Sequence, residues 1–272
     1  MRRALKPTYQ IGPMVVAFES DDSELLDWAR QPHAGRETFR PAEATIELRR
    51  HHGVLAGPPA PELTTTASGY ELAYHGWRAT LDTVTARCVA RISGSADHPM
   101  RGPRRVASLT RVLVGRLLLE RGGLAFHGAA LVHRGRGFLF VGRRGAGKTT
   151  LVTRFPGDRV LGDDHAFVMP GSTGFRLFGT PYAGREGTAS VVGDAPLAAV
   201  HVIAHGERTE ATRLNAAHAF RQLTPHVIHA GSSASGSGQV LDALHALVTE
   251  VDTHDLRVNL NQPLWPVVDG AL

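Results

Sequence analysis

Residues 142–149 read Gly-Arg-Arg-Gly-Ala-Gly-Lys-Thr, which is the G-x-x-x-x-G-K-T pattern of the loop that holds phosphates in P-loop nucleotide enzymes. Of the 30 lysines and arginines in the chain, only Lys6 and Lys148 are lysines. A compact ammonium on a flexible stem reaches between two phosphates more easily than a planar guanidinium does. Lysine therefore stands where this loop needs it, and the stretch predicts a nucleotide-binding α/β domain.

The sequence on both sides of the loop fits this prediction. Residues 137–141 form a short apolar run that predicts a buried strand, and residues 149–155 predict a short helix that ends at Pro156-Gly157. A strand, a glycine-rich loop and a helix in this order point backbone N–H groups and a helix dipole at an anion. We expect the hydroxyl of Thr149 to bind Mg²⁺. The expected phosphate contacts are Gly142, Arg143, Arg144, Gly145, Ala146, Gly147, Lys148, Thr149 and Thr150.

Two adjacent carboxylates, Asp163 and Asp164, follow a predicted strand at residues 159–162, only fifteen residues after Lys148. A strand that begins so soon after the loop helix is expected to lie beside it, which brings both carboxylates to the phosphate end. One carboxylate can hold Mg²⁺ and the other can accept the proton of an attacking hydroxyl. The acidic strand of ABC and AAA ATPases comes much later in the chain, so the spacing favours a phosphotransferase of another kind.

His127 lies in a predicted strand, residues 124–132, that forms a hairpin with the strand entering the loop. The side chain could orient or tune an aspartate, or it could contact phosphate. It could equally be one of the fifteen histidines satisfied within the core. The residues alone leave these alternatives open.

The chain is predicted to contain two domains, a smaller β-rich module at residues 1–100 and the P-loop domain at residues 101–272. We find no catalytic motif in the first. In the second, the patterns predict a helix ending at Gly122-Gly123, a hairpin within 166–178, a strand at 197–204, helices at 215–224 and 239–250 with a flexible loop at 231–238 between them, and a final strand at 255–260.

Composition excludes several classes of protein. The net charge of +5 comes from scattered arginines without interleaved aromatic residues, so we do not expect nucleic-acid binding. The single cysteine, Cys88, rules out an intramolecular disulfide and a cysteine-based zinc site, and we expect it to be buried. The chain has no 18-residue apolar run and no convincing signal peptide, so we expect a cytoplasmic protein that does not enter a membrane.

Three segments together resemble the catalytic domain of HPr serine kinase/phosphorylase: His127-Gly-Ala-Ala-Leu131, the glycine-rich loop, and Leu161-Gly-Asp-Asp164. They lie within roughly residues 124–170. The loop and the segment Gly162-Asp-Asp-His165 are also similar to phosphoenolpyruvate carboxykinase, which is related in fold. Residues 179–182, 195–197 and 241–258 resemble the branch found beside peptide-modifying gene clusters, which includes lasso-peptide precursor kinases.

The resemblance implies an α/β P-loop domain with a mixed sheet and an ATP- and Mg²⁺-dependent serine kinase. It assigns Lys148 and Thr149 to phosphate and Mg²⁺, Asp163 to the general base, Asp164 to the metal side, and His127 to the neighbourhood of the phosphate, with the two aspartates interchangeable in role. The implied acceptor is a hydroxyl on a peptide or small protein, and the preferred acceptor is a serine in the tail of a lasso-peptide precursor. A homo-oligomer is also implied.

The sequence departs from that family at two places. Arg144 stands where the family loop usually has serine, and the arginine-glycine-leucine-glycine signature of true HPr kinases is missing, with Arg185 as a candidate substitute. HPr itself is therefore not the expected substrate. Three alternatives stay open: a nucleotide-binding sensor without transferase activity, a small-molecule kinase, and a carboxykinase-like enzyme.

Overall fold

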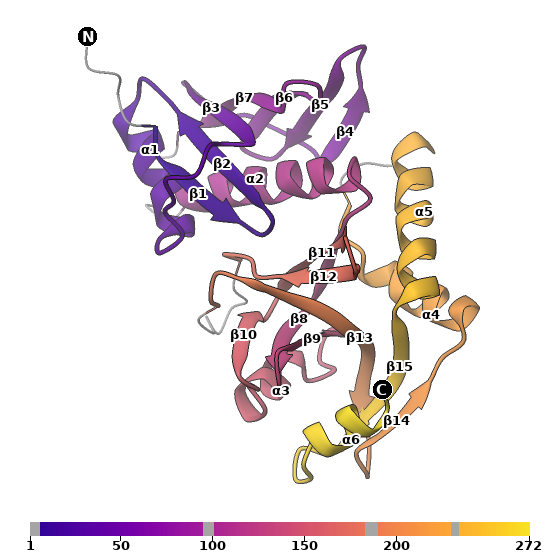
Figure 1. Ribbon diagram of the computed structural model, residues 1–272. Helices are drawn as coiled ribbons and strands as arrows, with labels where there is room; N and C mark the ends of the chain where they lie inside the picture. Colours follow the sequence, from indigo (N-terminus) through magenta and orange to yellow (C-terminus); the bar gives the residue numbers. More distant parts are fainter. Residues whose placement is uncertain (1–5, 95–100, 183–189, 230–233) are drawn as a thin grey trace. The chain divides into compact units, whose positions relative to one another are not determined.

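The computed structural model describes residues 6–94, 101–182, 190–229 and 234–272 (Figure 1). The candidate residue Arg185 lies outside these ranges. The chain forms two compact units of mixed α/β structure, each built on its own mixed sheet. The first unit comprises Met1–Leu117 with His229–Ser237, and the second comprises Leu118–Ile228 with Gly238–Leu272.

The first unit is a seven-stranded sheet in the order β1-β2-β3-β7-β6-β5-β4. Strand β3 is parallel to both of its neighbours, and the remaining pairs are antiparallel. The elements are β1 (Thr8–Ile11), β2 (Met14–Glu19), α1 (Ser23–Arg30), a 3-10 helix (Gln31–His33), β3 (Ala44–His51), β4 (Glu62–Thr65), β5 (Gly69–Tyr74), β6 (Trp77–Asp82), β7 (Arg87–Ser93) and α2 (Arg101–Leu119).

Local sequence explains where helix α1 begins. The side chain of Asp22 caps α1 by accepting hydrogen bonds from the backbone N–H groups of Glu24 and Leu25, which a helix start leaves without intrahelical partners. Helix α1 then buries Trp28.

Cys88 is fully buried in β7, as expected, and burial raises the pKa of its thiol. Helix α2, predicted to open the second domain, belongs to the first unit for most of its length.

The described part of the second unit contains an eight-stranded sheet, four α-helices and a 3-10 helix. Strand β8 pairs with β9 and β11, β11 with β12, β12 with β13, and β13 with β9, so these pairings close a ring. The elements are β8 (Leu124–His133), β9 (Arg136–Val141), α3 (Lys148–Arg154), β10 (Arg159–Gly162), β11 (His165–Gly171), β12 (Gly174–Phe178), β13 (Asp194–His205), β14 (Glu210–Arg213), α4 (Ala216–Leu223), a 3-10 helix (Thr224–His226), α5 (Ala234–Glu250), β15 (Asp252–Val258) and α6 (Trp265–Gly270).

Strand β9 leads into the glycine-rich loop and is held on both edges, antiparallel to β8 and parallel to β13. The predicted hairpin with β8 is confirmed. Its turn, Arg134-Gly135, has φ of 51° and 73°, so both residues are left-handed, as a two-residue hairpin turn of type I′ requires.

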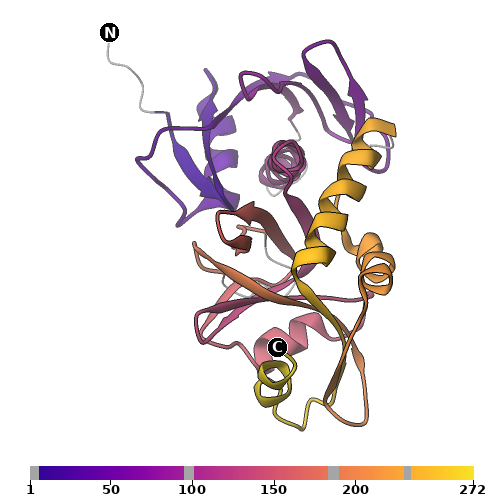
Figure 2. The same cartoon turned by 45° about the vertical axis from the view of Figure 1, so that its right-hand side comes forward.

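The apolar sequence of β9 follows from burial on both faces of the sheet. On one face, Leu139 belongs to a core that includes Leu244 of α5. On the other face, Phe140 belongs to a second core with Leu151 of α3 and Trp265 of α6. Helices α3 and α6 therefore cover the same face (Figure 2). Because β9 packs against a core on each of its faces, the start of the loop has a fixed position.

The strand predicted at 159–162 is present as β10, which pairs with β8. Two features differ from the sequence predictions. The flexible loop predicted at 231–238 is wrong for residues 234–238, which begin α5, because burial of residues such as Leu244 and Leu247 outweighs the poor helix propensity of glycine and serine. The last strand, β15, is followed by α6, which the sequence patterns missed. None of the described helices is long and apolar enough to span a membrane.

Candidate functional site

The glycine-rich loop connects β9 to α3 in the second unit. Gly145 and Gly147 have φ of 83° and 93°, which other residues adopt only with strain. Gly147 is the N-cap of α3, and no side chain caps this helix start in the described structure. The N–H of Ala146 donates to the carbonyl of Arg143 at 3.0 Å, which closes a tight turn inside the loop. The backbone thus curls as a phosphate-binding loop must.

Lys148 is the first residue of α3, and it is only 8% exposed. Its Nζ donates hydrogen bonds to the carbonyl oxygens of Gly142 at 2.6 Å and Arg143 at 3.4 Å, so the ammonium lies under its own loop. Burial lowers the pKa of Lys148, and the negative charge of Asp164 opposes that shift. The loop lysine and one of the two predicted carboxylates therefore act on each other electrostatically.

The remaining loop residues differ in their exposure to solvent. Arg143, Arg144 and Thr150 are exposed, and Thr149 is partly exposed. The two guanidinium groups are therefore accessible to an anion, and the Thr149 hydroxyl is accessible to a metal ion, without a change in the fold.

Asp163 and Asp164 form the short gap between β10 and β11, which run antiparallel along β8 one after the other. The backbone N–H of Gly128 in β8 donates to the carbonyl oxygen of Asp164 at 3.0 Å, which fixes the gap against β8. Asp163 is 3% exposed, whereas the side chain of Asp164 is 29% exposed. Two neighbouring carboxylates thus have different surroundings, and a solute reaches Asp164 more easily.

The carboxylate of Asp164 lies between two imidazoles. Its Oδ1 is 3.1 Å from Nδ1 of His127, and its Oδ2 is 3.2 Å from Nε2 of His165. Hydrogen bonds from His127 and then from His165 hold the pKa of Asp164 far below its usual range. Asp164 is therefore an anion at neutral pH, and the structure places His127 where it orients this aspartate.

Strand pairing explains why the two histidines meet. His127 of β8 and His165 of β11 are register partners, and their ring centroids are 6.1 Å apart. The pairing of β8 with β11 ends at His127, and its pairing with β9 begins at the next residue, Gly128. His127 therefore lies beside the start of the pairing with β9, the strand that leads into the glycine-rich loop. Its side chain is 44% exposed.

A comparison with protein families assigns this part of the chain. The model of a family described as SynChlorMet cassette protein ScmC matches residues 104–272, more than half of the chain. The chain belongs to the ScmC family. No curated protein matches it. The ScmC-family segment contains the whole glycine-rich loop, both aspartates and both histidines of the Asp164 cluster.

Two further histidines of the ScmC-family segment are linked to the loop, His205 by a contact and His226 electrostatically, and the sequence patterns missed both. His205 ends β13, and its Nε2 lies 3.1 Å from the carbonyl oxygen of Gly145. Because β13 is parallel to β9, its carboxyl end arrives at the loop, so the predicted strand at 197–204 held a usable signal. The second, His226, is buried in the 3-10 helix after α4, and no local pattern indicates its position.

The described residues contain no group of three or more histidine, cysteine, aspartate or glutamate side chains that could hold a metal ion. Mg²⁺ at phosphate-binding sites usually takes one or two protein oxygens and keeps water and substrate oxygens as its other ligands. Thr149 and Asp164 supply oxygens of that kind. The Mg²⁺ prediction does not depend on such a group.

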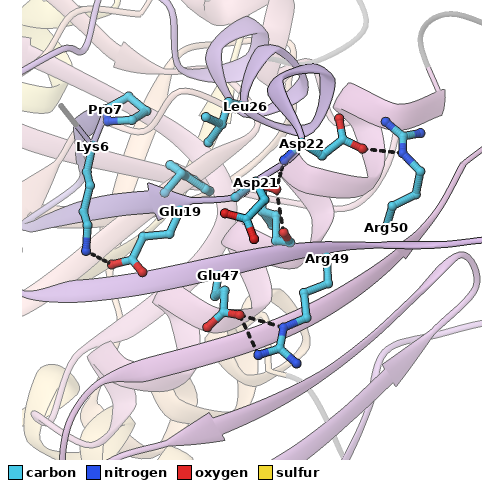
Figure 3. A pocket seen from close by; sticks show the side chains of 12 residues that line it. Lys6, Pro7, Glu19, Asp21, Asp22, Leu26, Glu47, Arg49 and Arg50 are labelled. Atoms are coloured by element: carbon cyan, nitrogen blue, oxygen red, sulfur yellow. Dashed lines mark hydrogen bonds and ion pairs between the residues drawn. The ribbon is translucent and has the colours of Figure 1, made fainter. Parts of the chain in front are cut away.

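The first unit has a pocket of about 720 Å³, outside the ScmC-family segment (Figure 3). Its cations are paired with carboxylates of the same pocket. Arg49 binds Glu47 at 2.6 Å, and the other pairs are Lys6 with Glu19 and Arg50 with Asp22. Because these cations are paired within the pocket, they are less available to an anionic ligand than the exposed arginines of the loop.

Proposed function

We propose that this protein is an ATP- and Mg²⁺-dependent kinase that phosphorylates a hydroxyl on a peptide or small protein. One observation carries the proposal: the buried lysine of a glycine-rich loop lies within electrostatic reach of an aspartate that two histidines hold ionised. Nucleotide binding alone needs the loop and its lysine. A carboxylate cluster added at the same place supports phosphoryl transfer.

The loop fits a nucleotide triphosphate. Gly145 and Gly147 give it the left-handed turns that let backbone N–H groups approach phosphate oxygens. The Nζ of Lys148 is satisfied by Gly142 and Arg143 carbonyls and can exchange them for phosphate oxygens, which are stronger acceptors because they are charged. The exposed guanidinium of Arg144 adds a cation at the rim.

The chemistry of Thr149 and Asp164 suits Mg²⁺, which prefers oxygen ligands. When bound, Mg²⁺ neutralises charge on the phosphate oxygens. The Thr149 hydroxyl is partly exposed, and Asp164 is ionised, so both can act as ligands without first losing a proton. His127 and His165 restrict the rotation of the Asp164 carboxylate, which keeps its remaining lone pairs in a fixed direction.

The chain's own residues then have separate tasks in the transfer. The acceptor oxygen forms a bond to the terminal phosphorus while the bond from that phosphorus to the leaving oxygen breaks. Asp163, which is 3% exposed, takes the proton of the acceptor hydroxyl as general base. Lys148 stabilises the charge that develops on the phosphate oxygens.

The finer fold assignment is part of the same proposal. An antiparallel hairpin that feeds the loop strand, inside a mixed sheet, supports an HPr-kinase-like arrangement rather than a purely parallel P-loop fold. The likeness of the downstream segments to kinases of peptide-modifying clusters supports a precursor peptide as acceptor, with a serine in its tail as the preferred hydroxyl.

Incubation with Mg²⁺, ATP and candidate precursor peptides tests the proposal. We expect a peptide to gain the mass of one phosphoryl group with the wild-type protein. ATP turnover without any modified peptide would point to a small-molecule kinase, and ATP binding without turnover would point to a sensor. Either result would contradict the peptide-kinase proposal.

A further inference from the structure

Three histidines form a row across neighbouring chain segments of the second unit. His165 and His127 are register partners in β11 and β8. On the other side of β8, Phe126 forms an antiparallel bridge with Val227. In an antiparallel bridge the residues next to the bridged pair also face each other, so His226 lies opposite His127.

A backbone hydrogen bond fixes the third member of the row. The N–H of Ile228 donates to the carbonyl oxygen of Ala125 at 2.7 Å, so the chain just after the 3-10 helix is held against β8 beside the Phe126–Val227 bridge. His226 is only 9% exposed. A buried polar side chain next to such an anchor has a defined position, unlike one on a free loop.

The surroundings of His226 are cationic. Burial lowers the pKa of its imidazole, and the positive charges of Lys148, His127 and Arg143 lower it further. His226 is therefore neutral at pH 7, with one ring N–H to donate. A neutral donor among cations is suited to an anion that enters between them, because it adds a hydrogen bond without adding repulsion.

We propose that His226 donates a hydrogen bond to the terminal phosphate of the bound nucleotide, as a further binding residue beside Lys148. This inference rests on the proposed function, because it requires a nucleotide in the loop. The contact comes from outside the loop, from a segment about eighty residues further along the chain. The described residues show no metal-binding group of three at this place, so the row favours an anion over a metal ion.

Nucleotide affinities test the contact directly. We would measure the Kd of ADP and of the non-hydrolysable analogue β,γ-methylene-ATP, each with Mg²⁺, by titration calorimetry. His226→Leu removes the donor, His226→Gln keeps an N–H donor, and His218→Ala removes an exposed histidine of the nearby helix α4 as a matched control. Thermal unfolding of each variant checks that it is folded.

We expect His226→Leu to weaken the triphosphate analogue by about tenfold or more and to leave ADP within about twofold, with substantial recovery in His226→Gln. His218→Ala should match the wild type. Equal affinities of the wild type and folded His226→Leu for the analogue would overturn the inference, and so would an equal loss for both ligands. If the wild type binds neither ligand, the proposed function itself fails, and the inference fails with it.

Discussion

Nδ1 of His127 lies 3.1 Å from Oδ1 of Asp164 and donates a hydrogen bond to that carboxylate. The contact fixes the orientation of the His127 ring, although the side chain is 44% exposed. It also keeps Asp164 ionised within reach of the buried ammonium of Lys148. The opposite charges of Asp164 and Lys148 thus couple the carboxylate cluster to the glycine-rich loop, a coupling that a phosphotransferase needs.

The two aspartates should respond differently to removal of their charge. We expect Asp163→Asn to bind Mg²⁺·ATP but to lose on the order of 10²-fold or more in turnover, because the acceptor proton has no base. Asp164→Asn should instead weaken the binding of Mg²⁺·ATP, since the metal-side carboxylate is gone. Calorimetric titration and steady-state turnover measure the two effects. The reverse pattern would exchange the two roles.

The two left-handed glycines of the loop form a matched pair for mutation. An added Cβ at Gly145 meets nothing within 4 Å, whereas one at Gly147 comes within 3.3 Å of Cε1 of His205. Gly145→Ala should therefore cost only the backbone strain, roughly 1–2 kcal/mol in the free energy of unfolding. Gly147→Ala should lower the free energy of unfolding by more than that, and it should weaken nucleotide binding more than Gly145→Ala does.

Urea unfolding of both alanine variants measures this difference. The close contact is absent from the double variant Gly147→Ala/His205→Ala. Its free energy of unfolding should therefore equal that of the double variant Gly145→Ala/His205→Ala. If Gly147→Ala proved as stable as the wild type, the described loop conformation would be wrong.

The buried histidine His201 predicts how stability depends on pH. Its ring is fully buried and stacks against Phe140 and His254 at centroid distances of 5.2 Å each. Burial, and then the neighbouring His254, lowers its pKa from 6.5 to about 3. Between pH 6.5 and pH 3, His201 is therefore protonated in the unfolded chain but neutral in the folded chain. The free energy of unfolding decreases as the pH falls through this range.

Replacement by phenylalanine isolates this effect. His201→Phe keeps a ring in the stack and removes the titration, so the pH dependence of the unfolding free energy should become shallower below pH 6.5. The slope should fall by up to about 1.4 kcal/mol per pH unit. Above pH 6.5 the two proteins should show the same slope. His33, whose pKa burial lowers to about 4, leaves a residual slope of the same sign in both. An unchanged slope in urea unfolding between pH 7 and pH 5 would refute the prediction.

Local patterns predicted the parts of the site that the chain itself keeps close together. The strand, loop and helix around Lys148 and the acidic pair after residue 162 lie within a short stretch, so turn chemistry and periodicity reveal them. His205 comes to the loop through the pairing of β13 with β9, and His226 is placed by the bridge between Phe126 and Val227. No single short window of sequence contains either arrangement.

Residues 234–238 show a different limit. Their glycine- and serine-rich composition predicted a flexible loop, yet they form the first turns of α5. Propensity is a weak local preference, and the apolar residues that follow, including Leu244, bury the helix firmly enough to extend it backward. Tertiary packing of this kind is invisible to composition.

The binding of Mg²⁺·ATP to Lys148→Met tests the central claim most directly, because the account depends on this ammonium meeting the phosphates. The chain supplies its own control, since Lys6 is its only other lysine and pairs with Glu19 in the first unit. We predict that Lys148→Met weakens Mg²⁺·ATP by about tenfold or more and that Lys6→Met stays within about twofold of the wild type. If Lys148→Met bound as tightly as the wild type, the loop would not be a phosphate site and the account would be contradicted.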